Sequence, residues 1–212
     1  DILGKGINSL GIKVNKAELS EEYIATLLNG IDATKVELNF KVCVKEAAKL
    51  ASLLKAYFAS EKYDLSQVYG SICCDPINRM LLKGKKLSAE EITKILIEVL
   101  QESEALVNFP VIGVNAVSFN NAGVYCAQEL GYALAWGNQY LELLTEAGVD
   151  PMVAKSIKFA FGVGGNYFME IAKFRAARLL WAKIVKQYEP KCDCACKMHV
   201  CAFTTEYNQT MY

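Results

Sequence analysis

Short apolar runs alternate with amphipathic stretches along the whole chain. The runs are rich in Val, Ile and Phe and are bounded by Gly, Pro, Asn or Asp, a pattern typical of strands. We expect strands at residues 7–14, 36–40, 68–73, 111–119, 157–161 and 198–203. Between them, apolar positions recur at helical spacing, which predicts helices over 44–58, 89–103, 121–147 and 166–188. This alternation predicts an α/β fold with a parallel sheet.

Two of the predicted helices have clear apolar faces. The helix at 44–58 is expected to bury Ala47, Leu50, Ala51 and Leu54. The helix at 166–188 is expected to bury Phe168, Ile171, Ala172, Ala176, Leu179, Leu180 and Ile184. Its opposite face, with Lys173, Arg178 and Lys186, is expected to meet solvent.

The spacing of the strands suggests an incomplete repeat. Their centres lie about 38 residues apart, and eight such units, which close a (β/α)8 barrel, need roughly 300 residues. The chain has 212 residues and ends at a sixth strand. The spacing alone is compatible with a complete open sheet or with six of the eight units of a barrel.

Composition excludes several classes of protein. Basic and acidic residues balance at 23 each, so no overall charge favours nucleic acid. No apolar run reaches the ~18 residues of a membrane span, and the N-terminus does not have the pattern of a signal peptide. We therefore expect a soluble, cytoplasmic protein, and we interpret Cys43, Cys73, Cys74 and Cys126 as reduced thiols in apolar segments.

The most unusual local motif is a cluster of thiols near the C-terminus. Cys192, Cys194, Cys196 and Cys201 lie within ten residues, with His199, the one histidine, between them. Zinc is a candidate ligand, but zinc sites use C-x2–4-C pairs, and an extended C-x-C-x-C sends its three thiols to one side. We favour an exposed loop that is prone to oxidation over a metal site.

The carboxyl ends of parallel strands are where ligands bind in such folds. The glycine-rich run from Gly162 to Asn166 lies between a strand and a helix, but it lacks the complete phosphate-binding fingerprint. We interpret it as a tight turn, and Asp75-Pro76 as the opening of another turn. No strand end carries two carboxylates and a base.

Three segments resemble one known family. Residues 168–178 read FMEIAKFRAAR, residues 121–137 read NAGVYCAQELGYALAWG, and residues 69–75 read YGSICCD. They are similar to two long helices and one strand of the methylmalonyl-CoA mutase family, and the likeness covers nearly the whole chain. The resemblance implies a TIM barrel, of which residues 1–212 form about six of eight units, followed in the family by a cobalamin-binding domain that is absent from this chain.

The family interconverts methylmalonyl-CoA and succinyl-CoA through a radical generated on adenosylcobalamin. Its acyl-CoA substrate passes along the barrel axis between small polar side chains. The resemblance therefore implies vestigial substrate contacts at Ser71, Lys83 and Thr204. Lys83 stands near the family's carboxylate-binding arginine, and a lysine cannot form the same bidentate contact.

The departures from the family pattern concern its catalytic positions. Ser118 stands where catalytic members have a histidine that holds the substrate carbonyl, Cys73 replaces a glutamine and Cys74 an asparagine. A second family histidine falls near Cys201. Losing these donors together removes the polar contacts to the acyl group.

The resemblance and its departures predict the small, non-catalytic subunit of a two-chain mutase, inactive alone. This chain is expected to bind no cofactor, with adenosylcobalamin in a large catalytic partner. Two alternatives remain: an active acyl-CoA mutase of altered specificity, and an unrelated open-sheet protein with a Cys-rich metal site. We also expect Ser118 at a strand end facing the barrel axis, and self-association through the edges at 7–14 and 198–203.

Overall fold

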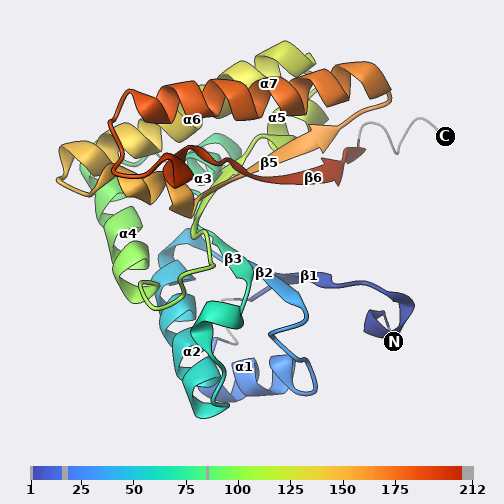
Figure 1. The fold of residues 1–212 in the computed structure, drawn as a ribbon, viewed down its shortest axis with the longest axis vertical. Helices are drawn as coiled ribbons and strands as arrows, with labels where there is room; N and C mark the ends of the chain where they lie inside the picture. The colour runs from blue at the N-terminus through green and yellow to red at the C-terminus, as the bar shows by residue number, and fades with distance from the viewer. Residues whose placement is uncertain (1, 16–18, 85, 207–212) are drawn as a thin grey trace. The chain divides into compact units, whose positions relative to one another are not determined.

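The computed structural model describes residues 2–15, 19–84 and 86–206 and forms two compact units (Figure 1). Unit 1 comprises residues 1–76 and 90–112, and unit 2 comprises residues 77–89 and 113–212. Each unit contains a three-stranded sheet and the helices that cover it. The predicted α/β class is confirmed.

The sheet of unit 1 is parallel and follows chain order. It consists of β1 (Ser9–Lys13), β2 (Glu37–Lys41) and β3 (Gly70–Cys73). Leu10 pairs with Leu38, and Leu38 with Gly70. The chain at 108–112 runs beside β3, because the Ile72 N–H donates to the Pro110 carbonyl at 3.0 Å.

Three α-helices accompany this sheet. They are α1 (Glu21–Leu28), α2 (Ala47–Ser60) and α4 (Ala89–Glu102), with 3-10 turns at Leu3–Lys5, Val44–Glu46 and Leu65–Gln67. The short helix α1 was not predicted; it begins where the Ser20 hydroxyl accepts the Tyr23 N–H. Helix α2 buries the predicted face, including Leu50 and Leu54, against the sheet side that carries Leu38 and Phe40.

Unit 2 repeats the same architecture with longer helices. Its strands, in sheet order, are β4 (Ile112–Asn115, whose first residue belongs to unit 1), β5 (Ile157–Val163) and β6 (His199–Thr204). Its helices are α3 (Pro76–Lys83), α5 (Val117–Asn121), α6 (Cys126–Glu146) and α7 (Tyr167–Lys186), with 3-10 turns at Pro151–Ser156 and Asp193–Cys196. Strand β5 is parallel to β6, with Phe159 opposite Val200.

Two predicted boundaries in unit 2 are wrong. The strand expected at 111–119 ends at Asn115, and residues 117–121 form helix α5 instead. Gly123, at φ 84°, separates α5 from α6, so the helix expected from residue 121 begins at Cys126. Asp75-Pro76 does not open a simple turn, because Pro76 occupies the first position of α3, where proline is favourable.

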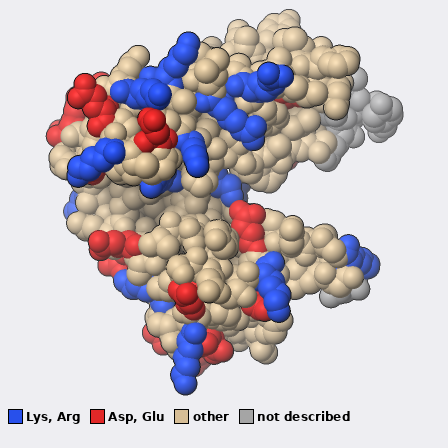
Figure 2. All heavy atoms as spheres, in the orientation of Figure 1, with Lys and Arg blue, Asp and Glu red and all other residues tan. Residues whose placement is uncertain are grey.

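The buried face of α7 is also not the predicted one. Lys173 and Trp181 belong to the buried stripe, whereas Phe168 is 80% exposed and Leu179 is 59% exposed. The Trp181 ring packs edge-on against Phe159 of β5 at 4.8 Å between centroids. Basic side chains are visible over the region of unit 2 where α7 lies (Figure 2). The apolar stripe chosen from the sequence therefore faces away from the sheet.

Two further features of the described chain bear on function. No described helix is long and apolar enough to cross a membrane. Among the described pairings, β1 stands at one end of its sheet and β6 at one end of the other. Self-association through these edges stays a prediction.

Candidate functional site

A row of polar side chains crosses the sheet of unit 1. The Ser9 hydroxyl donates to Glu37 at 3.0 Å, the Asn39 amide donates to Ser9 at 3.0 Å, and the Ser71 hydroxyl donates to Asn39 at 2.6 Å. Side chains alternate along a strand, so this row lies on the face opposite Leu38 and the helices. We call Ser9, Glu37, Asn39 and Ser71 the polar ladder. Its small hydroxyl and amide groups can donate to or accept from a polar chain passing over the sheet.

The structure places two of the predicted site residues in unit 1. Ser71 is a buried member of the polar ladder, and its expected contact with the substrate stays a prediction. Cys73 is half-buried at the last position of β3. Cys74 follows it and is fully buried, and this burial raises the pKa of its thiol well above the ordinary value, with the charges of Cys73 and Asp75 adding to the effect. Cys74 is thus a poor nucleophile.

Ser118 lies in helix α5 rather than on a strand. Its hydroxyl donates to Asn78 of α3 at 3.2 Å and accepts from the Asn115 amide at 3.4 Å. The expected position at a strand end is therefore wrong by three residues, because β4 ends at Asn115. Both described hydrogen-bond partners of the hydroxyl are neutral amides, which cannot take its proton and activate it for nucleophilic attack.

The other predicted positions in unit 2 lie on α3 and β6. Lys83 is exposed at the end of α3, and Thr204 is exposed at the end of β6. Cys201 lies within β6, with its Sγ 3.5 Å from the Phe159 carbonyl oxygen. The buried threonine at this strand end is the next residue, Thr205, which is 1% exposed.

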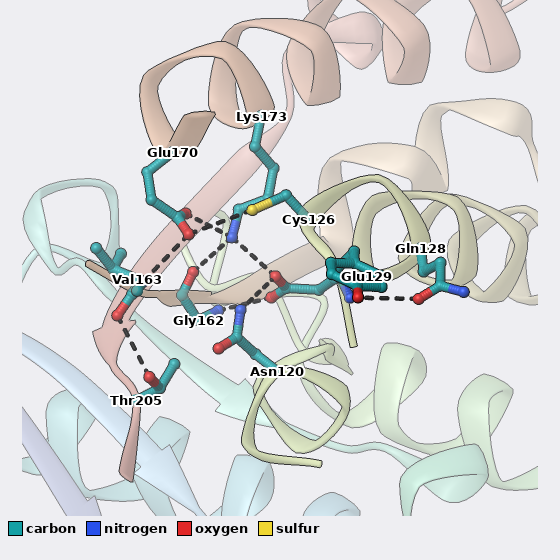
Figure 3. A network of polar contacts seen from close by, with 11 residues as sticks. Asn120, Cys126, Gln128, Glu129, Gly162, Val163, Glu170, Lys173 and Thr205 are labelled. Atoms are coloured by element: carbon teal, nitrogen blue, oxygen red, sulfur yellow. Dashed lines mark hydrogen bonds and ion pairs between the residues drawn. The ribbon is translucent and has the colours of Figure 1, made fainter. Parts of the chain in front are cut away.

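A buried ion-pair cluster occupies the carboxyl end of β5 (Figure 3). The Lys173 Nζ lies 2.8 Å from Glu129 of α6, 2.6 Å from Glu170 of α7 and 2.7 Å from the Gly162 carbonyl oxygen. The Gly162 N–H donates to Glu129 at 2.8 Å, and the Asn120 amide donates to the same carboxylate at 2.7 Å. The charged side chains are 0 to 8% exposed.

The cluster holds the turn between β5 and α7. The Gly164 N–H donates to Glu170 at 3.1 Å, and the Asn166 side chain caps α7 by accepting the Met169 N–H. The glycine-rich run is therefore a turn between strand and helix, as predicted. A Cβ on Gly162 would lie 2.6 Å from Asn120, so a side chain there would collide with the cluster.

The electrostatics of the cluster favour a charged lysine and an inert thiol. Burial alone lowers the pKa of Lys173, but its hydrogen bonds to Glu129 and Glu170 outweigh that effect and raise the pKa above the ordinary value. Cys126 lies 3.5 Å from Glu170, and burial together with this carboxylate raises the pKa of its thiol. The arrangement links four elements, β5, α5, α6 and α7, and among the described residues of the cluster it presents no activated nucleophile.

The sequence contains a signal for this cluster that was misread. Glu170 and Lys173 are three residues apart on α7, and they continue the stripe of Ala177, Trp181 and Val185 at helical spacing. The sequence predicts Lys173 on the solvent face because of its charge. Its actual position depends on Glu129, which is 44 residues away in the sequence.

The Cys-rich loop does not have the arrangement of a metal site. Cys192 and Cys194 are joined by a disulfide, so two of the four candidate thiols are not available as ligands. Among the described residues, no group of three or more His, Cys, Asp or Glu could hold a metal ion. Cys196 and Cys201 are not part of a disulfide, and neither are Cys43, Cys73, Cys74 and Cys126. Cys192 is exposed but Cys196 is buried, so only part of the loop meets solvent, and the preference for a loop over a metal site stays a prediction.

Parallel strands in chain order, with helices after each of β1 to β5, define a β/α-repeat protein. The chain belongs to the methylmalonyl-CoA mutase family, because the family profile of methylmalonyl-CoA mutase matches residues 8–212. The small subunit of methylmalonyl-CoA mutase from Porphyromonas gingivalis is 44% identical over the whole chain. The large subunit from the same organism is 31% identical over 81% of the chain.

A more distant small subunit, from Streptomyces virginiae, is 29% identical over 87% of the chain. The chain spans only part of these relatives: 34% of the Porphyromonas gingivalis small subunit, 24% of its large subunit and 30% of the Streptomyces virginiae small subunit. The matches therefore describe one portion of a longer protein in each relative.

Proposed function

We propose that this chain forms part of the barrel of the small, non-catalytic subunit of a two-chain methylmalonyl-CoA mutase. One observation carries the proposal. The chain is 44% identical to the Porphyromonas gingivalis small subunit over its full length, against 31% over 81% for the large subunit of the same organism. A chain descended from the small-subunit line is expected to show this difference.

The proposed barrel contains six of the eight β/α units within residues 1–212. Two three-stranded sheets, each with its strands in chain order, support this proposal, since the strands of a (β/α)8 barrel are also neighbours in chain order. The cobalamin-binding domain of the family lies outside these units. Strands β1 and β6 would then be the open edges, and we propose that copies of the isolated chain associate through them. Light scattering that shows a monomer at high concentration would contradict this association.

The proposed subunit is inactive by itself because its polar residues are weak substitutes for catalytic histidines. Ser118 is held by two neutral amides, and Cys201 lies against a backbone carbonyl. Neither group can carry the positive charge with which an imidazolium stabilises a developing oxyanion. We assign catalysis to a large subunit.

The polar ladder is the proposed vestige of the substrate passage. Its groups, Ser71 among them, are small and hydrogen-bonded to one another across three strands. They suit an extended chain with amide and hydroxyl groups, such as the pantetheine arm of a CoA ester. Lys83 and Thr204 are exposed, and we propose only weak contacts with the substrate for them.

The described residues do not fit cobalamin. Cobalamin binding in the family uses a loop with the pattern D-x-H-x-x-G. His199 is the one histidine of the chain, and it begins strand β6 rather than lying in such a loop. Burial and the nearby charge of Lys158 lower its pKa. We therefore propose that adenosylcobalamin, which supplies the radical chemistry of the family, is bound by the large subunit. Six of the eight cysteines are not part of a disulfide, which supports a reducing compartment, and we propose the cytoplasm.

Co-purification with a large subunit tests the proposal. The tagged chain is mixed with a methylmalonyl-CoA mutase large subunit similar to that of Porphyromonas gingivalis, and mutase activity is assayed with adenosylcobalamin. We expect a complex whose activity requires the large subunit. Ser118→Ala in this chain should leave that activity unchanged, whereas alanine at a catalytic position would reduce it by orders of magnitude.

Two results would overturn the proposal. One is mutase activity of this chain without a large subunit. The other is binding of cobalamin to this chain alone at micromolar concentration, followed by its absorption spectrum.

A further inference from the structure

The loop between α7 and β6 contains a chemically distinctive pair. Cys192 and Cys194 form a disulfide at the start of the 3-10 turn Asp193–Cys196. We propose that they are a redox-active pair that exchanges electrons with small cellular thiols and disulfides of the glutathione class. This site is independent of the function proposed above, because the pair lies outside the polar ladder and the buried ion-pair cluster.

Exposure to solvent distinguishes this pair from the buried cysteines. Cys192 is exposed and Cys194 is partly exposed, whereas Cys196 and Cys74 are buried. Thiol–disulfide exchange requires direct approach to a sulfur atom, so exposed disulfides are the reactive ones. Cys74 is further disfavoured because burial raises the pKa of its thiol. Small thiols are therefore expected to react first at Cys192.

The disulfide contributes little to holding the loop. Its cysteines are two residues apart, and the entropy that a cross-link removes from the unfolded chain is smallest for short loops. The loop has other attachments: Lys191 forms an ion pair with Asp150 at 2.6 Å, and Ala195 is fully buried. The fold can therefore persist in both redox states, as a reversible pair requires.

A local hydrogen bond also favours the reduced, ionised form of Cys192. The Cys194 N–H lies 3.2 Å from the Cys192 Sγ and can donate to a thiolate there. Lys191 precedes Cys192 in the sequence, but its ammonium pairs with Asp150 at 2.6 Å, and Lys186 lies 3.9 Å from Asp193. The backbone hydrogen bond is therefore the group that favours the thiolate, which is the attacking species in exchange.

The exchange proceeds in two balanced steps. A small thiolate attacks the Cys192 Sγ, a mixed disulfide forms, and the bond to Cys194 breaks, with its electron pair leaving on the Cys194 sulfur, which then takes up a proton. A second small thiolate attacks the small-molecule sulfur of the mixed disulfide and releases Cys192 as a thiolate. The protein gains two electrons, and two small thiols are oxidised to one disulfide.

Thiol counting in glutathione buffers tests the proposal. The full chain is equilibrated in buffers of different reduced-to-oxidised glutathione ratio, quenched with acid and alkylated in denaturant. The fully reduced chain has eight alkylatable thiols. In oxidising buffer we expect six, the cysteines outside that disulfide, and full return to eight after reduction. Trypsin releases residues 192–197, because lysines precede and end that segment.

Fragmentation of that peptide identifies the pair. We expect it to be lighter by two hydrogens, with alkylated Cys196, which assigns the bond to Cys192 and Cys194. Cys194→Ser should leave Cys192 as a stable mixed disulfide with glutathione. Cys201→Ser, a matched control outside the pair, should move the glutathione ratio at half-oxidation by less than about twofold. Circular dichroism checks that each variant is folded.

Three outcomes would overturn the proposal. The first is a bond that includes Cys196, and the second is equal oxidation at Cys43 and Cys73, which would make the reaction indiscriminate. The third is one zinc ion per reduced chain, measured by metal analysis, since the thiols would then serve as ligands. None of these outcomes bears on whether the chain binds a large subunit.

Discussion

Helices α2 and α7 have similar amphipathic sequences but are buried in opposite ways. Helix α2 buries the apolar stripe that its sequence predicts, with Leu54 fully inside. Helix α7 exposes much of its predicted stripe and buries Glu170 and Lys173 instead. The difference shows that a charged side chain does not have to lie at the surface. It can be buried when opposite charges and backbone groups satisfy it completely.

The exposed stripe of α7 has a distinct position on the helix. Phe168, Arg175 and Leu179 recur at spacings of seven and four residues, on the side opposite the buried stripe. Within unit 2, the sheet packs against the buried stripe of α7 and leaves the exposed stripe uncovered. Helix α2, in contrast, leaves no comparable run of large apolar residues exposed among the described positions.

The largest effect is expected from removing the cation of the buried cluster. Lys173→Met leaves the carboxylates of Glu129 and Glu170 buried without a counter-charge, which should cost about 3–5 kcal/mol of unfolding free energy. Urea denaturation measures this loss. Lys183→Met, on the exposed side of the same helix, should change stability by less than about 0.5 kcal/mol. Equal losses in the two variants would contradict the burial of Lys173.

A pair of leucine substitutions compares the two helices directly. Leu54→Ala empties a fully buried site in α2 and should cost about 2–5 kcal/mol. Leu179→Ala removes the same atoms from a site in α7 that is 59% exposed, and should cost less than about 0.5 kcal/mol. Thermal and urea unfolding measure both. A loss above about 2 kcal/mol for Leu179→Ala would mean that its face of α7 is covered in solution.

Two glycines of α6 test how tightly α6 packs near α7. A Cβ on Gly137 would lie 2.5 Å from the Phe159 ring and 3.0 Å from Trp181, so Gly137→Ala should cost about 1–3 kcal/mol. Gly131 has open space around it, and Gly131→Ala should stabilise the helix by up to about 1 kcal/mol. Opposite signs for the two alanine variants are expected in urea titrations. Stabilisation by both alanine variants would show that the packing around Gly137 is loose.

The smallest effect concerns a surface ion pair in unit 1, the exposed counterpart of the buried cluster. Hydrogen bonds from Thr34 and Lys35 lower the pKa of Asp32 from 3.8 to about 2. A carboxyl group whose folded pKa is depressed adds stability above its unfolded pKa, and loses it as pH falls from 3.8 towards 2. NMR titration should place the Asp32 midpoint near 2, and Thr34→Ala should move it upward. An unshifted midpoint would show that the turn is open in solution.

Much of the fold could be read from local patterns, and the errors have a common cause. The predicted strands at 36–40 and 157–161 overlap β2 and β5, because these apolar runs are buried whichever elements cover them. The predicted strand at 111–119 was wrong at its end because Val117 and Phe119 continue the apolar pattern of the strand, yet residues 117–121 form α5. Helical and extended states differ little for such short segments, so contacts elsewhere in the chain decide between them.

The candidate site was less predictable than the fold. Ser71 was found among the small polar residues, but its partners Asn39 and Ser9 come from two other strands, and only strand register brings them together. The cluster around Lys173 was missed for the same reason, since its carboxylate Glu129 belongs to another helix. Local periodicity has no information on pairs so far apart in the chain.

The sequence by itself determined the α/β class, the order of the strands and of the four longest helices, and the family, because these depend on local periodicity and on motifs such as residues 168–178. Only the tertiary structure decided which side of α7 faces the sheet, where Ser118 lies and which polar groups meet across strands. The physical reason is that burial of a charge depends on its partners. A lysine is a surface residue when it is alone and a core residue when two carboxylates and a carbonyl oxygen surround it.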